Sequence, residues 1–486
     1  MNCFYLGDKS FKCLFKSWQT SITFSPNTHL DADNGYLISR VNVMQNFSNQ
    51  SQLKIAMLFV VSTLLLVSAC TAKSKLEPLA GYGINPVLPA PNKELVPTVN
   101  IAPAIGWSNN EKPTAGQGLR VNVFANQLQH PRWLYALPNG DVLVAETNSP
   151  AKPKGRFSVS AWVAAKVMKK AGAGVPSPDR IILLRDSNND GEADKRTIFL
   201  EGLHSPFGMA LIGETLYVAN ADAILAFPYH EGDEVISSVG TKLIDLPSGI
   251  NHHWTKNILP SEDGTKLYVT VGSNSNVAEK GFDIEVDRAA IWQVDVKTGA
   301  HQLYATGLRN PNGMAWEPTT KTLWTVVNER DELGNDLVPD YLTSVKEGGF
   351  YGWPYSYYGQ HVDQRVSPQQ PSLVAKAIVP DYALGAHTAS LGLAYSSDNA
   401  LPSHLQNGMI VSQHGSWNRK PLSGYKVIFI PFVNGMATGQ PINVLTGFVN
   451  QTGEANGRPV GVVIDKQGAL LLADDVGDTI WRVIGK

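Results

Sequence analysis

Cysteine is nearly absent from this 486-residue sequence. Its three cysteines are Cys3, Cys13 and Cys70, so the rest of the chain can form no disulfide and carries no CxxCH haem-attachment or zinc motif. Charge is also scarce: Asp, Glu, Lys and Arg make up 17% of the residues, and the formal net charge is −2. No positive excess points to nucleic acid as a partner. Glycine, Trp and Tyr are plentiful instead, a composition typical of short strands and tight turns.

The N-terminal quarter contains a single apolar run. Residues 1–43 are polar and unpatterned and are predicted to be a non-native upstream extension. Residues 44–70 resemble a lipoprotein signal peptide, with a basic residue, the apolar run Met57–Leu66 and the ending Val-Ser-Ala-Cys. The run is short for a transmembrane anchor, which is the alternative. We expect export to the periplasm and an outer-membrane lipid anchor at Cys70. Residues 71–118, rich in Pro and Gly, are expected to form an extended linker.

The remainder of the chain, residues 119–486, repeats one pattern six times. Each copy has turn residues followed by an apolar strand, and most continue into a second strand such as RIILLRD or TIWRVIG. The copies are residues 137–147, 211–221, 261–272, 318–329, 405–415 and 465–475. This pattern predicts an all-β fold, a six-bladed β-propeller of four-stranded blades. The last copy has no outer strand of its own, so residues 121–128 are expected to supply it and close the ring.

Two insertions interrupt the repeats. Ser160–Ala171 has helix-forming residues between Pro and Gly, which predicts a short surface helix. His361–Pro380 is a polar loop with Pro and Gln, and it is interpreted as variable decoration more than as part of a site.

An acidic turn lies between two apolar strands. Asp186, Asn188, Asp190 and Asp194 alternate with other residues around a glycine, which matches the first part of a calcium loop. A complete EF-hand would need Glu where Thr197 stands, and the flanking strands indicate a hairpin. We favour a structural calcium site slightly over a turn held by Asx hydrogen bonds.

Paired histidines precede the third copy of the repeat. His252 and His253 are adjacent, and adjacent residues on a strand point to opposite faces. One of them can therefore line a central cavity, where a neutral imidazole is a suitable general base near pH 7. The alternative is a hydrogen-bonded structural histidine.

Several motifs together resemble one family. Gly307–Gly359 is the densest stretch, with an Arg-Asn pair, a run of acids and two Gly-aromatic turns. LRNPNGMAW, NERDELG, GGFYGWPY, HTASLGLAY and HGSWNR, in this order, resemble the sorbosone dehydrogenase branch of the soluble quinoprotein sugar dehydrogenases. The resemblance spans roughly residues 119–486. It implies a six-bladed propeller that binds pyrroloquinoline quinone (PQQ) with Ca²⁺ and oxidises sugar hydroxyl groups.

The resemblance also implies roles for individual residues. His253 matches the catalytic base, and Arg309 matches the arginine beside the reactive quinone carbonyl, where a fixed cation stabilises developing negative charge. Asn310 follows it in the family's Arg-Asn-Pro turn. Arg330 and Asp331 stand where backbone carbonyls hold the cofactor's calcium, in place of the Gly-Pro of the glucose enzymes.

A further set of residues is matched to cofactor binding. Asn274 resembles a residue that contacts the quinone, and Arg458 one that pairs with a PQQ carboxylate. The other matches lie in loops whose lengths differ from those of the glucose enzymes: Arg419, His387, Thr388 and His204. Each of these residues has a structural alternative, such as bracing a turn between blades.

The expected function is therefore an exported PQQ- and calcium-dependent dehydrogenase of an aldose or sorbosone-like sugar. Because the chain has no haem-attachment motif, its electrons must pass to a separate acceptor such as a cytochrome or membrane quinone. The alternatives are a calcium-dependent lactonase of the propeller type, which needs convergent carboxylates, and a propeller that acts only as a binding module.

Overall fold

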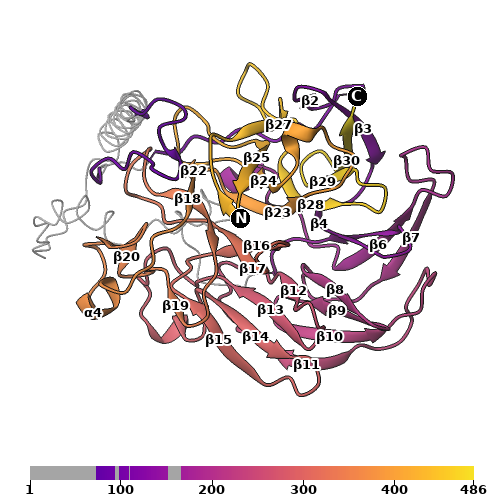
Figure 1. Cartoon of the computed structure of the whole chain (residues 1–486), viewed down its shortest axis with the longest axis horizontal. Helices are drawn as coiled ribbons and strands as arrows, with labels where there is room; N and C mark the ends of the chain where they lie inside the picture. The colour runs from indigo at the N-terminus through magenta and orange to yellow at the C-terminus, as the bar shows by residue number, and fades with distance from the viewer. Residues whose placement is uncertain (1–72, 93–97, 109, 152–165) are drawn as a thin grey trace, which may run out of the picture. The chain divides into compact units, whose positions relative to one another are not determined.

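The chain forms the six-bladed propeller that its repeats predict (Figure 1). The computed structural model describes residues 73–92, 98–108, 110–151 and 166–486. Expectations for residues 1–43 and 44–70, including Cys70, lie outside this part of the chain. The first strands of the six blades, β4, β8, β12, β16, β23 and β28, contact one another in turn around the ring. Within the described residues, no helix is long and apolar enough to cross a membrane.

The first two blades are four-stranded antiparallel sheets. Blade 1 consists of β4 (Pro131–Ala136), β5 (Val142–Glu146), β6 (Arg180–Arg185) and β7 (Lys195–Leu200). Blade 2 consists of β8 (Met209–Ile212), β9 (Thr215–Ala219), β10 (Ala223–Pro228) and β11 (Thr241–Asp245).

The next two blades each gain a fifth strand. Blade 3 consists of β12 (Ile258–Pro260), β13 (Lys266–Val271), β14 (Ala290–Asp295), β15 (His301–Thr306) and the parallel strand β19 (Gly349–Phe350). Blade 4 consists of β16 (Pro311–Glu317), β17 (Thr322–Val327), β18 (Pro339–Ser344), β22 (Tyr382–Ala386) and β1 (Tyr82–Gly83).

The last two blades both include strands from near the N-terminus. Blade 5 consists of β23 (Ser390–Ser396), β24 (Gly408–Gln413), β25 (Lys426–Val433), β27 (Ile442–Thr446) and β2 (Thr114–Ala115), with β26 (Met436–Ala437) beside β25. Blade 6 consists of β28 (Pro459–Ile464), β29 (Leu470–Asp474), β30 (Thr479–Gly485) and β3 (Leu119–Ala125). The predicted ring closure is confirmed, because β3 pairs with β30 from Leu119 to Ala125.

Each blade is held to the next by its own apolar cluster. Strand β5 is buried along its whole length, since both faces of its sheet are covered by neighbouring blades. One cluster joins blades 6 and 1 through Leu471 and Val144, and another joins blades 3 and 4 through Ile291 and Leu323. This arrangement places the core between the sheets and leaves the centre of the ring to polar residues.

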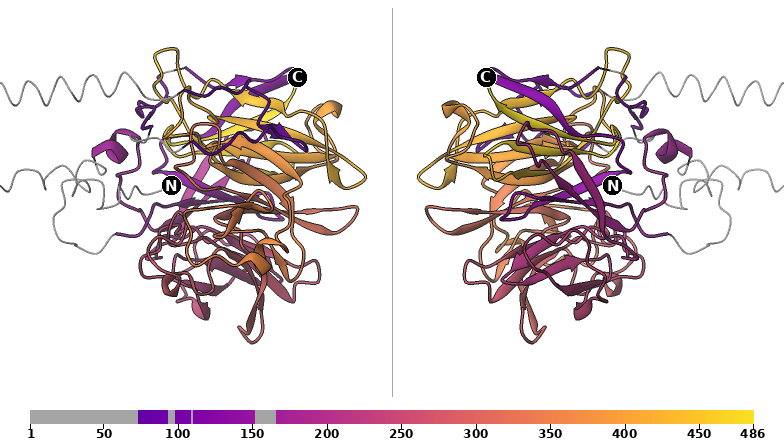
Figure 2. Two further views of the ribbon diagram at one scale, coloured as in Figure 1. Left: turned by 90° about the vertical axis from the view of Figure 1, so that its left-hand side faces the viewer. Right: turned by 90° about the vertical axis from the view of Figure 1, so that its right-hand side faces the viewer.

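The insertions carry little regular structure. Residues 166–170 are helical, in agreement with the second half of the helix predicted for Ser160–Ala171, and this helix stands out from one end of the propeller (Figure 2). The loop His361–Pro380 contains α4 (Pro371–Val374), and its strand β21 (His361–Val362) pairs with β20 (Ser356–Tyr357). Two short 3-10 helices are η1 (Asp283–Glu285) and η2 (Ser403–Leu405).

The described part of residues 71–118 is extended and packs on the propeller. It adds β1 to blade 4 and β2 to blade 5, and Trp107 donates a hydrogen bond from Nε1 to Asp474 Oδ2 at 2.7 Å. Near its start, Ser74 Oγ donates to Asp336 Oδ1 at 2.5 Å. The segment expected to be a linker is therefore tied to several blades.

Candidate functional site

Polar side chains gather at one end of the ring because of the strand register. In each blade the residues that enter the first strand lie beside those that leave the second, since the two strands are antiparallel. Pro311 pairs with Val327 in blade 4, and Pro459 pairs with Asp474 in blade 6. Residues just before the first strands and just after the second strands therefore meet at the same end of the molecule.

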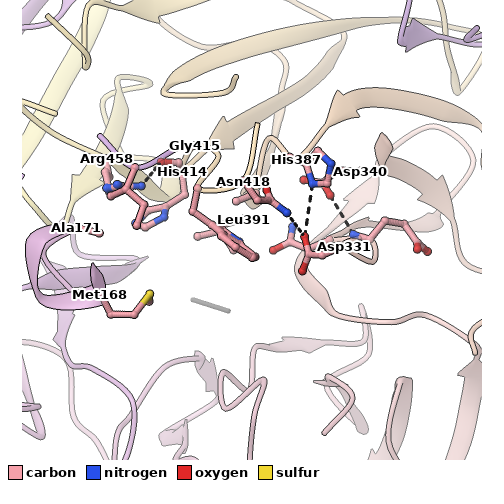
Figure 3. Close-up of a pocket in the computed structure, with 15 residues that line it drawn as sticks. Met168, Ala171, Asp331, Asp340, His387, Leu391, His414, Gly415, Asn418 and Arg458 are labelled. Carbon is pink, nitrogen blue, oxygen red and sulfur yellow. Dashed lines mark hydrogen bonds and ion pairs between the residues drawn. The ribbon is translucent and has the colours of Figure 1, made fainter. Parts of the chain in front are cut away.

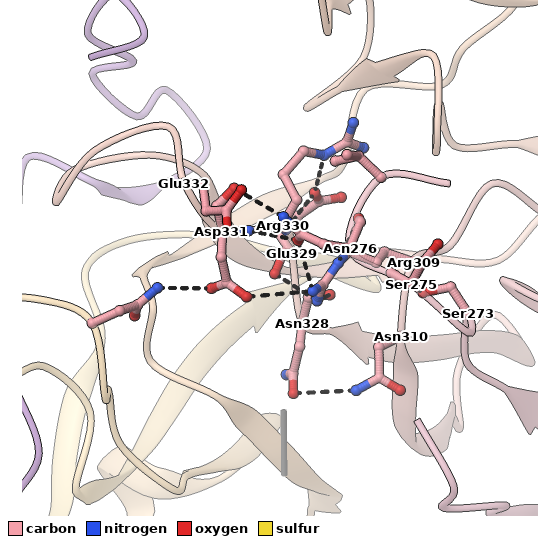
Figure 4. A network of polar contacts seen from close by, with 12 residues as sticks. Ser273, Ser275, Asn276, Arg309, Asn310, Asn328, Glu329, Arg330, Asp331 and Glu332 are labelled. Carbon is pink, nitrogen blue, oxygen red and sulfur yellow. Dashed lines mark hydrogen bonds and ion pairs between the residues drawn. The ribbon is translucent and has the colours of Figure 1, made fainter. Parts of the chain in front are cut away.

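Arg309 is the centre of one buried network at this end (Figure 4). The side chain is fully buried. Its Nη1 donates to the carbonyl oxygen of Glu329 at 2.8 Å, its Nη2 to Asn276 Oδ1 at 2.9 Å, and its Nε to the carbonyl of Asn276 at 3.1 Å. Its Nη2 also lies 3.4 Å from Asp331 Oδ2. Burial lowers the pKa of Arg309, and the nearby Asp331 opposes this change. The network fixes a guanidinium in a dry, rigid position.

His253 is held in one orientation beside this network. Its Nδ1 lies 2.7 Å from the carbonyl oxygen of Ser273, so Nδ1 carries the proton and Nε2 the lone pair of the neutral ring. Burial, and secondly the charge of Arg309, lowers the pKa of His253 well below its ordinary value. A side chain at Gly272 would meet Asn310 Oδ1 at 2.4 Å and the Cβ of His253 at 2.5 Å. The glycine thus brings His253 and Asn310 together, and Asn310 Oδ1 is buried without a hydrogen-bond partner.

A central cavity lies between blades 4, 5 and 6 (Figure 3). Asp331, His387, Asn418 and Arg458 line its polar side, and Met168 is among the apolar residues across it. Its volume is about 50 Å³. A cavity of this size has room for water and not for a ligand of several rings.

A second buried polar cluster joins blades 5, 6 and 1. Asp475 accepts hydrogen bonds from Arg132 Nη1 at 2.5 Å and from His414 Nε2 at 3.0 Å, and His130 Nε2 lies 3.7 Å from it. Burial lowers the pKa of His414 to about 4, so this ring is neutral. Arg132 Nε and Nη2 and Arg458 Nε are buried without hydrogen-bond partners. Such donors fit an anionic ligand, because a buried unpaired guanidinium N–H is costly.

The Asp475 cluster also stands between two cavities. His414 lines the central cavity, whereas His130 and Asp475 line a second one of about 790 Å³. The walls of the second cavity come from the N-terminal segment near Trp107, from residues 172–178 and from the loop after β29.

The structure brings together some of the predicted cofactor residues. His387 donates from Nε2 to the Gly334 carbonyl oxygen at 2.9 Å, and its Nδ1 lies 3.4 Å from Asp331 Oδ1. Thr388 Oγ1 donates to Asp340 Oδ2 at 3.0 Å, one layer behind the cavity. Arg458 borders the cavity, and its Nη2 donates to the Ala102 carbonyl at 3.2 Å.

Other predicted residues have structural contacts instead. Asn274 braces its loop, since Nδ2 donates to the Ile284 carbonyl at 2.9 Å. Arg419 points to the N-terminal segment, where Nη2 donates to Ser74 Oγ at 2.8 Å. His204 is half-exposed and pairs with Asp222 at 2.8 Å.

Of the two carbonyls predicted to hold calcium, that of Asp331 is already used by other donors. Arg365 Nη1 donates to the carbonyl oxygen of Asp331 at 2.8 Å, and Asn276 Nδ2 donates to the same oxygen at 3.3 Å. The Arg330 side chain is fully buried and pairs with Glu329 Oε2 at 2.9 Å. Arg365 belongs to the loop His361–Pro380, so this loop contacts the turn at Asp331.

The acidic hairpin between β6 and β7 forms a turn held by its own side chains. Asp186 Oδ2 accepts from the Gly191 N–H at 2.9 Å, Asn188 Oδ1 from the Asp190 N–H at 3.0 Å, and Asp194 Oδ1 from Ser187 Oγ at 2.9 Å. Among the described residues, no three His, Cys, Asp or Glu side chains are grouped to hold a metal ion. The hydrogen bonds match the alternative of an Asx turn.

Sequence reasoning missed Arg132, Asn276, Arg365 and the His414–Asp475 pair. One pattern could have found His414 and Asp475: the second strand of each repeat ends in polar residues, as in SQHG and ADD. Arg365 has no such pattern, because it lies in an irregular loop.

Comparison with families and relatives gives two partial matches and one distant relative. A family model described as a domain of unknown function (DUF7133) matches residues 153–416, more than half of the chain. A model described as TrAA12-like matches residues 361–486. The chain is 27% identical over 293 residues to an uncharacterized protein of Borreliella burgdorferi, which covers 58% of this chain and 76% of that one.

Several solved structures share the fold. An AA12 carbohydrate-active enzyme of Trichoderma reesei, in an iodide structure, is 18% identical with a TM-score of 0.63, covering 78% of this chain and 100% of that one. The holo PQQ domain of pyranose dehydrogenase from Coprinopsis cinerea is 17% identical with a TM-score of 0.61, covering 79% and 100%. The apo form of the soluble aldose sugar dehydrogenase from Escherichia coli is 14% identical with a TM-score of 0.53, covering 76% and 100%. At these identities the likeness establishes the propeller fold.

Proposed function

The chain belongs to the family described as a domain of unknown function (DUF7133), and we propose that it is a sugar dehydrogenase that uses PQQ. Two kinds of observation support this proposal. Its fold is similar to that of the pyranose dehydrogenase PQQ domain and of the aldose sugar dehydrogenase. Its own residues also place a neutral histidine, His253, near a buried guanidinium, Arg309, whose charge contributes to the lowered pKa of the histidine.

The observation that carries the proposal is the setting of His253. Hydrogen bonding at Nδ1 leaves Nε2 as the proton acceptor of the ring, and the depressed pKa keeps the ring neutral near pH 7. In the proposed reaction Nε2 takes the proton of a substrate hydroxyl. Arg309, which is rigidly held by four hydrogen bonds to Asn276, Asn328 and Glu329, stabilises the negative charge that develops nearby.

The charge of the site suits a polycarboxylate cofactor. When bound, PQQ would supply the two-electron acceptor of the reaction. Arg458 and Arg132, whose buried Nε atoms have no hydrogen-bond partner, would pair with its carboxylates. Because the central cavity measures about 50 Å³, PQQ can enter it only if lining residues move, and Ile101, Met168 and Ala171 are among the residues that line it.

The broader cellular role follows from the sequence and is also a proposal. The substrate is an aldose or a sorbosone-like sugar, the protein is exported with a lipid anchor at Cys70, and electrons pass to a separate cytochrome or quinone. The lactonase alternative gains no support from the described residues, which contain no convergent group of metal-binding carboxylates.

A titration tests the cofactor. We expect the purified protein to bind one equivalent of PQQ, observed by absorbance and tryptophan fluorescence, and the loaded protein to reduce a dye in the presence of a sugar from a panel of aldoses and ketoaldoses. Absence of binding together with absence of activity on every sugar would disprove the proposal.

A variant tests the base. His253→Asn should lower turnover by about 100-fold or more while PQQ affinity changes little, because general-base catalysis contributes roughly that factor. His404→Asn is the matched control. His404 is an exposed histidine of blade 5, so this variant should keep full activity. Unchanged turnover of the His253 variant would refute the assignment.

A further inference from the structure

The main-chain turn at Asp331 holds a guanidinium where the family resemblance implies a metal ion. A carbonyl oxygen has two lone pairs, and both are used at Asp331: by Arg365 Nη1 at 2.8 Å and by Asn276 Nδ2 at 3.3 Å. Calcium would need the same oxygen at about 2.3–2.6 Å. A cation there would also lie against the positive charge of Arg365.

Arg365 is fixed in this position from its other side. Its Nε and Nη2 donate to Asp363 at 2.9 and 2.7 Å, a bidentate pair with a carboxylate whose side chain is 1% exposed. Burial alone would raise the pKa of Asp363, but Arg365 and Arg330 lower it to about 2, so this carboxylate is charged. The guanidinium is thus a rigid part of the site and not a mobile surface group.

The charges around the turn already balance. Three buried or nearly buried arginines, Arg309, Arg330 and Arg365, face the carboxylates of Glu329, Asp331 and Asp363. Each of these three carboxylates is therefore already paired with an arginine. The neighbouring buried carboxylate, Asp340, accepts hydrogen bonds from the N–H groups of Glu329 and Ser390 and from Thr388 Oγ1. Glu332, also in this turn, is exposed and lies 3.9 Å from Arg365.

We propose that Arg365 takes the place of calcium at this turn, so that the Asp331 carbonyl and the network around Arg309 are held without a metal ion. This proposal rests on the proposed function, because a calcium ion is expected at this turn only if PQQ binds beside it. Arg365 acts here as a positioning residue: it holds the turn from which Asp331 contacts Arg309, His387 and Asn418.

Thermal unfolding of the metal-stripped protein tests the proposal without PQQ or sugar. Melting temperatures are compared in EDTA and in about 1 mM CaCl₂, enough to fill sites of the extracellular type. All proteins carry Asp186→Asn and Asp190→Asn, which removes the acidic hairpin as a second source of calcium binding. We expect the parent protein to melt at the same temperature in both buffers.

Arg365→Gln should then create a calcium response. With the guanidinium gone, the Asp331 carbonyl keeps only the bond from Asn276, and Asp363 keeps its ion pair with Arg330. Both groups then have an oxygen lone pair to offer a cation, so the variant should melt several degrees lower in EDTA and be partly restored by CaCl₂. Arg196→Gln is the matched control. Arg196 lies on β7, the outer strand of blade 1, and also donates to main-chain carbonyls, those of Asn126 and Gln127. If Arg365→Gln does not fold, Arg365→Lys replaces it in the comparison, because lysine keeps the positive charge but cannot donate to Asp363 and to the Asp331 carbonyl with the geometry of a guanidinium.

Two results would overturn the proposal. One is a calcium-dependent rise in the melting temperature of the parent protein. The other is an Arg365 variant that responds to calcium no more than Arg196→Gln. Failure of PQQ to bind in the separate titration would remove the proposed function and leave this measurement intact.

Discussion

Gly272 sets the distance between the proposed base and its neighbour. A Cβ at this position would lie 2.4 Å from Asn310 Oδ1 and 2.5 Å from the Cβ of His253, so both side chains would have to move. We predict that Gly272→Ala folds, with a loss of about 1–3 kcal/mol in the free energy of unfolding from overpacking. Displacement of the base by a fraction of an ångström should lower turnover at least 10-fold.

The matched control for this change is Gly81→Ala. The nearest atom to a Cβ at Gly81 is 3.9 Å away, so the substitution adds a methyl group in ordinary contact. Denaturant unfolding and dye-reduction rates are measured for both variants. Equal activity of the two would show that the close contact at Gly272 does not position His253.

His414 makes stability depend on pH on the acid side. Its folded pKa is lowered from 6.5 to about 4 by burial, with Arg458 and Arg132 opposing the attraction of Asp475. Between pH 6.5 and 4 the unfolded chain therefore takes up a proton that the folded chain does not. His414 should therefore lower the free energy of unfolding by about 3 kcal/mol as the pH falls from 6.5 to 4. Above pH 6.5 its contribution to stability is complete.

The variant His414→Gln separates this contribution from others. Glutamine keeps an N–H donor for Asp475 but does not titrate. The free energy of unfolding of the variant should therefore fall less steeply from pH 6.5 to 4 than that of the parent protein. His130, whose pKa burial also lowers, is present in both proteins. Urea unfolding at several pH values measures the difference, and parallel curves would contradict the assignment.

Among structural elements, β3 is the strand that closes the ring. It pairs with β30 and buries Phe124 in the cluster between blades 6 and 1. We predict that Phe124→Ala lowers the free energy of unfolding by about 3–5 kcal/mol. Asn122→Ala, an exposed position on the same strand, should change it by no more than about 0.5 kcal/mol. Denaturant unfolding monitored by tryptophan fluorescence compares them, and similar midpoints would mean that the closure adds little stability.

Regular elements could be predicted from the sequence and irregular ones could not. The strand of each repeat was found from its apolar residues and turn, as for β5 and β29. The short strands β1 and β2 pair through only two residues each, so they leave no periodic pattern. The same limit applies to the site: Arg309 and His253 lie next to repeat strands, whereas Arg365 comes from a loop whose path depends on its ion pairs.

At the scale of the whole molecule, the centre of the propeller is polar because the apolar residues are used between blades. The buried arginines at this centre, Arg132, Arg309, Arg330 and Arg458, come from three different blades or the loops beside them. A sequence gives their number but not their partners, because most of their contacts join residues far apart along the chain. Arg132 and Asp475, for example, are joined only when blade 6 meets blade 1.

The contacts of the N-terminal segment predict how the propeller is oriented at a membrane. Ser74 is bonded to Asp336 and Arg419, at the end of the ring that carries the site. A lipid on Cys70 would therefore hold this end within about 14 Å of the bilayer, the reach of four extended residues. A fluorophore on Lys420→Cys should be quenched by lipid-attached quenchers more strongly than one on Glu262→Cys, which lies in the turn between β12 and β13 at the opposite end of the strands. Residues 71–486 contain no native cysteine, so the labels are specific. Equal quenching of the two labels would contradict the predicted orientation. If Cys70→Ser keeps both its membrane association and its acyl labelling, the anchor itself is contradicted.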